Sequence, residues 1–385
     1  MRVPYNSPSL NARSPFPLIL LTFLLAACSA PLSASQSPSS SATSTPTSSP
    51  TPAAGFRVLF TASSASSSDI YLYDSASSAP QHLVTLGTGF APEPRFISSQ
   101  KIAYIDSSNQ GTSNIVDFDL SSKASTTDVS APGQVLAFAF SHDSSKLAYL
   151  EHDASTGKAT LHVRSGGQDS PLSLNAIPGR GISRDDEVRL EYAPDDHFLL
   201  MVDTFVGNQG QSPETGQFLV LRSGDNTVAF VPPSGTSTNA TMAVWARGTD
   251  RLYYRDQSGV RSWDASATAV NTLIAGLRWY DPAVSPDGNS IAFTEFDSRG
   301  VPRVRTYDLT RHQVSPTTTQ PRSHPIFLTA DTVWSLEEQQ CTGECLGGPT
   351  ATTGKVFSYN LKTNAETALP FTDVNTLSEL AVSSR

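Results

Sequence analysis

The sequence predicts an all-β fold, a seven-bladed β-propeller, on three observations. First, a strand–turn–strand unit recurs along the chain at a spacing of roughly 40 to 50 residues, which is typical of propellers. Second, seven short apolar strands mark the centres of seven such units. Third, the first unit lacks an opening strand, and a segment at the end of the chain matches that missing piece. We therefore expect the C-terminus to supply the innermost strand of the first blade.

The clearest copy of the unit is Ser285-Pro286-Asp287-Gly288-Asn289-Ser290-Ile291-Ala292-Phe293. Pro286 pre-sets φ at the start of a tight turn, and Asp287 and Gly288 supply turn chemistry. Because apolar strands flank this turn on both sides, the segment predicts a β-hairpin. Two degenerate copies occur at 141–149 and 193–201.

This motif resembles the repeat of TolB-like propellers, a WD40-like repeat that is also found in the propeller domains of prolyl-oligopeptidase-type peptidases. The resemblance covers about residues 56–385, and it implies an architecture more firmly than an activity. It also implies a protein-interaction role at the cell envelope. TolB-like proteins carry an α/β domain before the propeller, whereas a Ser/Thr/Pro-rich segment occupies that place here. The resemblance therefore does not extend to a specific part in the Tol-Pal system.

The seven central strands follow one another in chain order. We expect them at 58–60, 102–104, 147–149, 199–201, 252–254, 291–293 and 333–335. Near the end of the chain, Ala381-Val382-Ser383 matches Ala283-Val284-Ser285, so we expect it to complete the first blade. A count of six or eight blades remains an alternative, because the unit between Ile177 and Pro232 is long and poorly patterned.

The N-terminus resembles a lipoprotein signal peptide, residues 1–28. Arg2 and Arg13 precede a short apolar run, and Leu25-Ala26-Ala27-Cys28 resembles a bacterial lipobox, in which the cysteine is lipidated. An ordinary signal peptide with an incidental cysteine is the alternative. Lipid on Cys28 would anchor the chain to a bacterial membrane surface, outside the cytoplasm, without crossing it.

Residues 29–54 consist almost entirely of Ser, Thr, Pro and Ala and carry no charge. Such a segment cannot bury a core, and we expect a disordered tether between the anchor and a propeller domain at 55–385. The two other cysteines, Cys341 and Cys345, favour a local disulfide in an extracytoplasmic protein. A metal site at this pair is the alternative, although no second Cys or His pair stands nearby.

A column of carboxylates is the main candidate binding feature. Two positions past the centre of each second strand, six of the seven predicted blades carry an acid: Asp106, Glu151, Asp203, Asp256, Glu295 and Glu337, with Ala62 in the first blade. We expect these acids to ring one face of the disc, where they are candidates to bind a cation such as Ca²⁺ or a basic partner. The alternative is that they cap strand ends, a role that suits Asp better than Glu.

The sequence favours a non-catalytic binding module. No Gly-x-Ser-x-Gly elbow, Gly-rich phosphate loop or His-Glu-x-x-His motif occurs. The net charge of −9, with only 26 scattered Lys and Arg residues, argues against a nucleic-acid partner. We expect an envelope protein or a glycan as the partner. Two alternatives stay open: a propeller enzyme of the lactonase, glycosidase or lyase type with a carboxylate-bound divalent metal, and a structural surface protein.

Overall fold

The computed structural model describes residues 55–63, 67–77, 79–87, 92–107, 112–173, 182, 186–204, 216–232, 242–315, 318–340 and 350–377. They belong to one compact unit that runs from Ala53 to Arg385. The predictions on the signal peptide with Cys28, on the tether 29–54, on Cys341 and Cys345, and on segment 381–383 fall outside the described residues.

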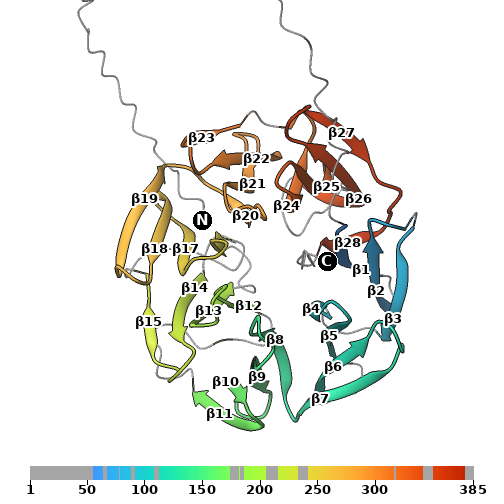
Figure 1. The fold of residues 1–385 in the computed structure, drawn as a ribbon, viewed down its shortest axis with the longest axis vertical. Coiled ribbons are helices and arrows are strands. Elements are labelled where there is room, and N and C mark those ends of the chain that lie inside the picture. Colours follow the sequence, from blue (N-terminus) through green and yellow to red (C-terminus); the bar gives the residue numbers. More distant parts are fainter. Residues whose placement is uncertain are drawn as a thin grey trace, which may run out of the picture. The chain divides into compact units, whose positions relative to one another are not determined.

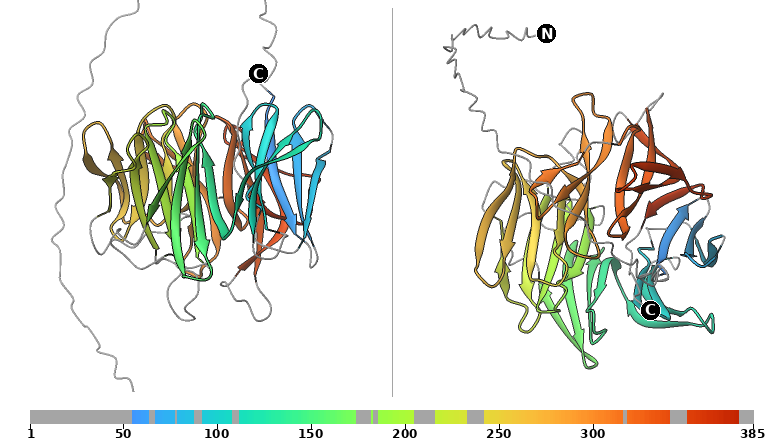
Figure 2. Two further views of the ribbon diagram at one scale, coloured as in Figure 1. Left: turned by 90° about the horizontal axis from the view of Figure 1, so that it is seen from below. Right: turned by 45° about the horizontal axis from the view of Figure 1, so that its top comes forward.

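The described chain forms a seven-bladed β-propeller, as the sequence predicts (Figure 1). Its seven sheets each contain four antiparallel strands and succeed one another around a ring. Figure 2 shows from the side that the strands run between the two ends of the disc. None of the described residues forms a helix long and apolar enough to cross a membrane.

The first three blades take their strands, from the innermost outward, as follows. Blade 1 contains β28 (Val374–Leu377), β1 (Arg57–Ser63), β2 (Ser67–Asp74) and β3 (Gln81–Gly87). Blade 2 contains β4 (Arg95–Ser98), β5 (Lys101–Asp106), β6 (Ser113–Asp119) and β7 (Ser125–Ala131). Blade 3 contains β8 (Gln134–Phe140), β9 (Lys146–Asp153), β10 (Lys158–Ser165) and β11 (Gln168–Ser173).

The other four blades follow the same order. Blade 4 contains β12 (Glu187–Tyr192), β13 (Phe198–Thr204), β14 (Gly216–Arg222) and β15 (Val228–Phe230). Blade 5 contains β16 (Ala243–Trp245), β17 (Arg251–Asp256), β18 (Gly259–Asp264) and β19 (Ala269–Ala275). Blade 6 contains β20 (Tyr280–Val284), β21 (Ser290–Phe296), β22 (Pro302–Asp308) and β23 (Gln313–Val314). Blade 7 contains β24 (Arg322–Thr329), β25 (Thr332–Gln340), β26 (Thr350–Asn360) and β27 (Ala365–Ala368).

The hairpin that joins the first and second strands of blade 6 forms where the repeat motif predicts it. The hydroxyl of Ser285 donates to Asp287 Oδ1 at 2.6 Å, and the same oxygen accepts from the backbone N–H of Asn289 at 3.2 Å. Gly288 has a positive φ of 72°, a conformation that glycine adopts without steric cost. The local turn chemistry therefore fixes the register of the two strands.

Neighbouring blades pack against each other through the alternating side chains of their second strands. In β21, Ile291 and Phe293 pack against blade 5, whereas Ala292 between them packs against Phe327 and Val333 of blade 7. All five side chains are buried. Because successive side chains of a strand point to opposite faces, one strand contributes to two interfaces.

The last strand that the structure describes, β28, pairs with the first, β1. Strand β28 is antiparallel to β1, with Leu377 opposite Phe60 and Val374 opposite Ala62. Val374 is fully buried. The described strand lies upstream of the segment 381–383 that the sequence match indicated, and the register of that segment stays a prediction.

An aromatic cluster accompanies this pairing. The ring centroid of Phe371, just before β28, lies 5.6 Å from that of Phe60 and 5.0 Å from that of Tyr73, both in blade 1. It also lies 5.5 Å from the centroid of Trp334 in blade 7. The segment before β28 thus joins the last blade to the first through buried aromatic surface, which is a large contribution per residue.

We predict that β28 is required for the stability of blade 1. A chain that ends at Asp373 loses β28, exposes the edge of β1 and removes the buried Val374. Its free energy of unfolding in urea should fall by more than about 2 kcal/mol, the scale of one large core truncation. A chain that ends at Leu377 keeps β28 and is the matched control, so it should be more stable than the chain that ends at Asp373. Equal unfolding midpoints for both truncations would contradict the prediction.

Candidate functional site

The six predicted acids occupy one structural position in six blades. Each lies at or near the end of a second strand, where the chain turns toward the third: in β17, Asp256 lies opposite Gly259, and in β21, Glu295 lies opposite Arg303. Ala62 takes the same position in β1. The column therefore lies at one end of the disc, which we call the 2–3 end. The other end, where first strands turn into second strands, is the 1–2 end.

Within the blades, cationic neighbours neutralise several of these acids. The Glu295 carboxylate lies 2.6 Å from the Arg305 guanidinium, and Asp256 lies 3.0 Å from Arg261 Nε. These partners come from the third strand of the same blade. The charges are thus largely compensated where they stand, as in ion pairs that stabilise a sheet.

Two further acids of the column also have partners in their own blade. Glu151 accepts a hydrogen bond from the Gly133 N–H at 2.7 Å and lies 3.3 Å from His162 Nε2. Glu337 accepts from the Thr353 hydroxyl at 2.8 Å and lies 3.3 Å from Lys355 Nζ. Burial raises the pKa of Glu337, but these two contacts outweigh it and leave the pKa below its usual value.

The column does not form one cluster of ligands. Asp203 is fully buried inside blade 4, and Asp106 is half-buried. Among the described residues, only one group of three His, Cys, Asp or Glu side chains brings its ligand atoms within 4.8 Å of one another, and it contains none of the six acids. Binding of Ca²⁺ or of a basic partner by the column stays a prediction.

A second set of polar groups meets at the 2–3 end, on the innermost strands. Glu187 begins β12 of blade 4, Asp281 lies in β20 of blade 6, and His324 lies in β24 of blade 7. We call these three residues the channel trio, because their strands lie nearest the centre of the ring (Figure 1). His324 Nε2 lies 3.7 Å from Asp281 Oδ2, and the backbone N–H of His324 donates to Thr294 Oγ1 at 3.1 Å.

The charges of Asp281 and His324 act on Glu187, the remaining residue of the channel trio. Glu187 is an exposed residue, yet surrounding protein atoms desolvate its carboxyl and raise the pKa, and the charge of Asp281 raises it further. His324 acts in the opposite direction and lowers it. The pKa of Glu187 therefore responds to residues from two blades that are not its neighbours in the ring.

Sequence reasoning missed the channel trio, although a signal for two of its members was present. Asp281 and His324 both precede a proline, and both have positive φ angles, 48° and 51°. They lie where the pairing between first and second strand is interrupted. Proline cannot donate to a ladder hydrogen bond, so a polar residue before proline in a first strand indicates a bulge.

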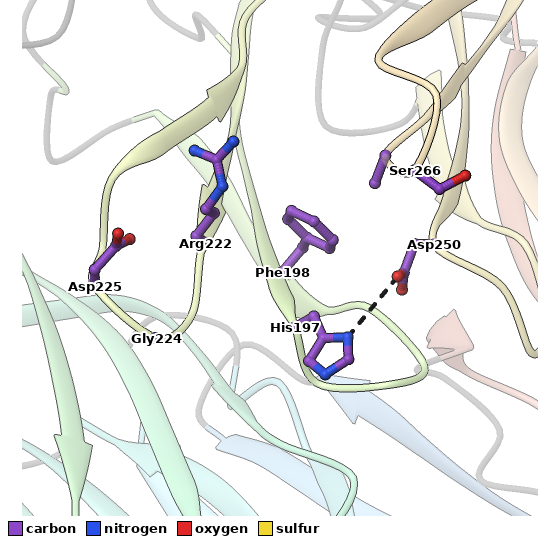
Figure 3. Close-up of a pocket in the computed structure, with 8 residues that line it drawn as sticks. His197, Phe198, Arg222, Gly224, Asp225, Asp250 and Ser266 are labelled. Atoms are coloured by element: carbon purple, nitrogen blue, oxygen red, sulfur yellow. Dashed lines mark ion pairs between the residues drawn. The ribbon is translucent and has the colours of Figure 1, made fainter.

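A groove of about 420 Å³ opens at the 1–2 end, between blades 4 and 5 (Figure 3). His197, Phe198, Arg222 and Asp225 of blade 4 line one side, and Asp250 and Ser266 of blade 5 line the other. His197 Nδ1 lies 3.9 Å from Asp250 Oδ2 across the groove.

Carboxyl groups crowd one corner of this groove. Desolvation and the nearby Asp195 raise the pKa of Asp250 to about 6. Desolvation also acts on Asp195, but hydrogen bonds from Asp250 and His197 outweigh it and lower the pKa of Asp195. Of the two carboxyl groups, Asp250 therefore has the higher pKa.

Comparison with solved structures bears on the fold alone, which is that of a propeller. A prolyl endopeptidase superposes with a TM-score of 0.57 and 13% identity over 83% of this chain and 49% of that one. An oligogalacturonate lyase in complex with manganese gives a TM-score of 0.50 and 10% identity over 82% and 85%. TolB from Acinetobacter baumannii gives 0.46 and 18% over 70% and 66%, a score at which the likeness carries no weight.

The chain thus spans about half the length of the prolyl endopeptidase that it resembles. No protein-family model and no curated protein matches the sequence.

We predict that Asp250 makes stability fall as pH rises. Its folded pKa of about 6 exceeds the ordinary 3.8, so the folded state holds this proton more tightly than the unfolded state. That contribution is complete below pH 3.8 and is lost as pH rises through about 6. Asp250→Asn should therefore unfold at higher urea than wild type at pH 7.5 in metal-free buffer, and this gain should vanish near pH 4.

The gain should not exceed about 1 kcal/mol, because solvent screens a side chain that is 25% exposed. Asp225→Asn in the same groove is the control. Thr227 hydrogen bonds lower the pKa of Asp225, so its removal should give no gain at pH 7.5. A gain in Asp250→Asn that is independent of pH would disprove the assignment.

Proposed function

We propose that the chain is a non-catalytic, lipid-anchored extracytoplasmic propeller that holds a partner of the cell envelope, a protein or a glycan, at its 2–3 end. The convergence of the channel trio from three blades supports this proposal most directly. A site built from residues far apart in the sequence depends on the whole ring, and such rigid scaffolds suit recognition.

The chemistry of the 2–3 end fits a partner rich in hydrogen-bond donors. Asp281 and Glu187 present carboxylate oxygens, and His324 adds a ring nitrogen that is half exposed. Nearby on β12, Arg189 pairs with Glu191 and donates to the Ala243 carbonyl at 3.0 Å, so its charge is already engaged. Amines of a basic protein segment and hydroxyls of a glycan both complement such acceptors.

The same geometry favours binding over metal-dependent chemistry in the acid column. The enzyme alternative requires several carboxylates that face one ion, as divalent metals need multiple oxygen ligands. Four acids of the column instead have hydrogen-bond or ionic partners in their own blades.

A photocrosslinking amino acid tests the proposed face. Placed at Glu187, which is exposed at the 2–3 end, it should capture an envelope component in cells. Placed at the exposed Asn289, in the hairpin at the 1–2 end, it should capture none. A protein adduct would identify a protein partner, and an adduct that glycan-degrading enzymes shorten would identify a glycan. Crosslinks from position 289 alone would place the partner on the wrong end and refute the proposal.

Anchoring by Cys28 gives a separate prediction. Lipid on this residue holds the chain at a membrane, with each buried methylene contributing about 0.8 kcal/mol. Cys28→Ala should move the protein from the membrane fraction to the soluble fraction and abolish incorporation of an alkyne-labelled palmitate. Cys341→Ala is the matched control and should keep both the lipid and the membrane location. Membrane retention with lipid in Cys28→Ala would contradict the lipobox interpretation.

A further inference from the structure

The hairpin at the 1–2 end of blade 4 departs from the repeat in the side chains that surround its turn aspartate. In blade 6 the turn aspartate, Asp287, is engaged by the Ser285 hydroxyl at 2.6 Å and by Asn289 Nδ2 at 3.0 Å. In blade 3 the equivalent Asp143 accepts from Ser141 at 2.7 Å and from Ser145 at 2.9 Å. Both oxygens of the turn aspartate are thus satisfied inside those hairpins.

In blade 4 the two donating side chains are replaced. Ala193 stands where blade 6 has Ser285, and His197 stands where blade 6 has Asn289. The equivalent carboxylate, Asp195, keeps one backbone contact, from the His197 N–H to Oδ1 at 3.0 Å. Its other oxygen, Oδ2, faces His197 Nδ1 in an ion pair.

Blade 5 places a second carboxylate opposite this pair. Asp250 occupies in its own hairpin the position that His197 occupies in blade 4. The ligand atoms of Asp195, His197 and Asp250 all lie within 4.8 Å of one another. Two adjacent hairpins therefore bring one imidazole nitrogen and two carboxylates to the same corner of the groove in Figure 3, where His197 and Asp250 are drawn.

A second observation concerns one carboxylate oxygen of this corner. Asp250 Oδ1 is shielded from solvent and has no hydrogen-bond partner. A carboxylate oxygen that is shielded from water without gaining a hydrogen-bond partner is destabilising, and a bound cation would relieve this.

We propose that Asp195, His197 and Asp250 bind a divalent first-row transition-metal ion of the Zn²⁺ or Mn²⁺ type. One imidazole with two carboxylates suits these ions, whereas Ca²⁺ and Mg²⁺ take oxygen ligands. His197 is 74% exposed and Asp195 is also exposed, so both side chains have room to close on an ion. Three protein ligands leave coordination positions open toward the groove, where water or a small anion near Arg222 completes the shell.

The test uses the full-length chain, stripped with a chelator and held in detergent. Mn²⁺ binding is followed by the loss of the free-ion EPR signal, and Zn²⁺ by its displacement of Mn²⁺. Wild type should bind one ion at this site. His197→Ala and Asp250→Asn should each weaken binding by more than about tenfold, since removal of supporting groups alone typically costs 10- to 100-fold.

His142→Ala is the matched control. His142 is another exposed histidine of a 1–2 hairpin that faces a carboxylate, Asp196, at 2.9 Å, but no second free carboxylate joins it. This variant should bind Mn²⁺ like wild type.

Absence of saturable binding in wild type would overturn the proposal, and so would equal affinity in wild type and His197→Ala. If Asp250→Asn failed to fold, the comparison of His197→Ala with His142→Ala would still decide. The inference is independent of the proposed function, because the groove lies at the 1–2 end and the crosslinking position 187 at the 2–3 end. Loss of metal binding would leave the crosslinks unchanged.

Discussion

In a ring of blades, every sheet has to bury both of its faces against neighbours, and the fold depends on this requirement. The second strand of each blade meets it by sending alternate side chains to opposite sides, as Phe293 and Ala292 do in blade 6. Blade 1 meets this requirement with residues that follow blade 7 in the sequence. Strand β28 and the aromatic cluster around Phe371 supply these residues, so the first and last blades hold each other in place.

The two ends of the disc then acquire different chemistry. At the 2–3 end, the innermost strands bring polar side chains of different blades together, as with Asp281 and His324. At the 1–2 end, short hairpins touch across blade boundaries. Asp196 of blade 4, for example, accepts hydrogen bonds from the backbone N–H groups of His142 and Asp143 in blade 3, at 2.7 and 3.1 Å. Such contacts between hairpins are what bring His197 and Asp250 within reach of each other.

The sequence predicts those features that local physics determines. Turn chemistry at Asp287 and Gly288 sets a hairpin, and strand periodicity then gives the seven central strands and the common register of the acids. Ion pairs such as Glu295 with Arg305 were within reach of the same reasoning, because both residues belong to one hairpin. Binding of a cation or a basic partner by the column stays a prediction, alongside these ion pairs.

Local sequence patterns do not predict features that depend on closure of the ring. Asp281 and His324 belong to adjacent blades, and Glu187 is separated from them by nearly a hundred residues and by blade 5. Likewise, the meeting of His197 with Asp250 requires the angle between two blades, which no local pattern encodes. The C-terminal match at 381–383 identified the right end of the chain, while the burial of Val374 marks the strand that the structure describes.

The pairing of acids with cations inside single blades has a consequence for how such a ring can grow. A blade that carries Glu295 together with Arg305, or Asp256 together with Arg261, brings its own counter-ion whenever a duplication copies it. This pair of side chains then adds no uncompensated charge to the neighbouring blades, which pack against the new copy through apolar side chains of the second strand. Each repeat is then free to diverge in its loops and hairpins, one at a time, without disturbing the electrostatic balance of the others.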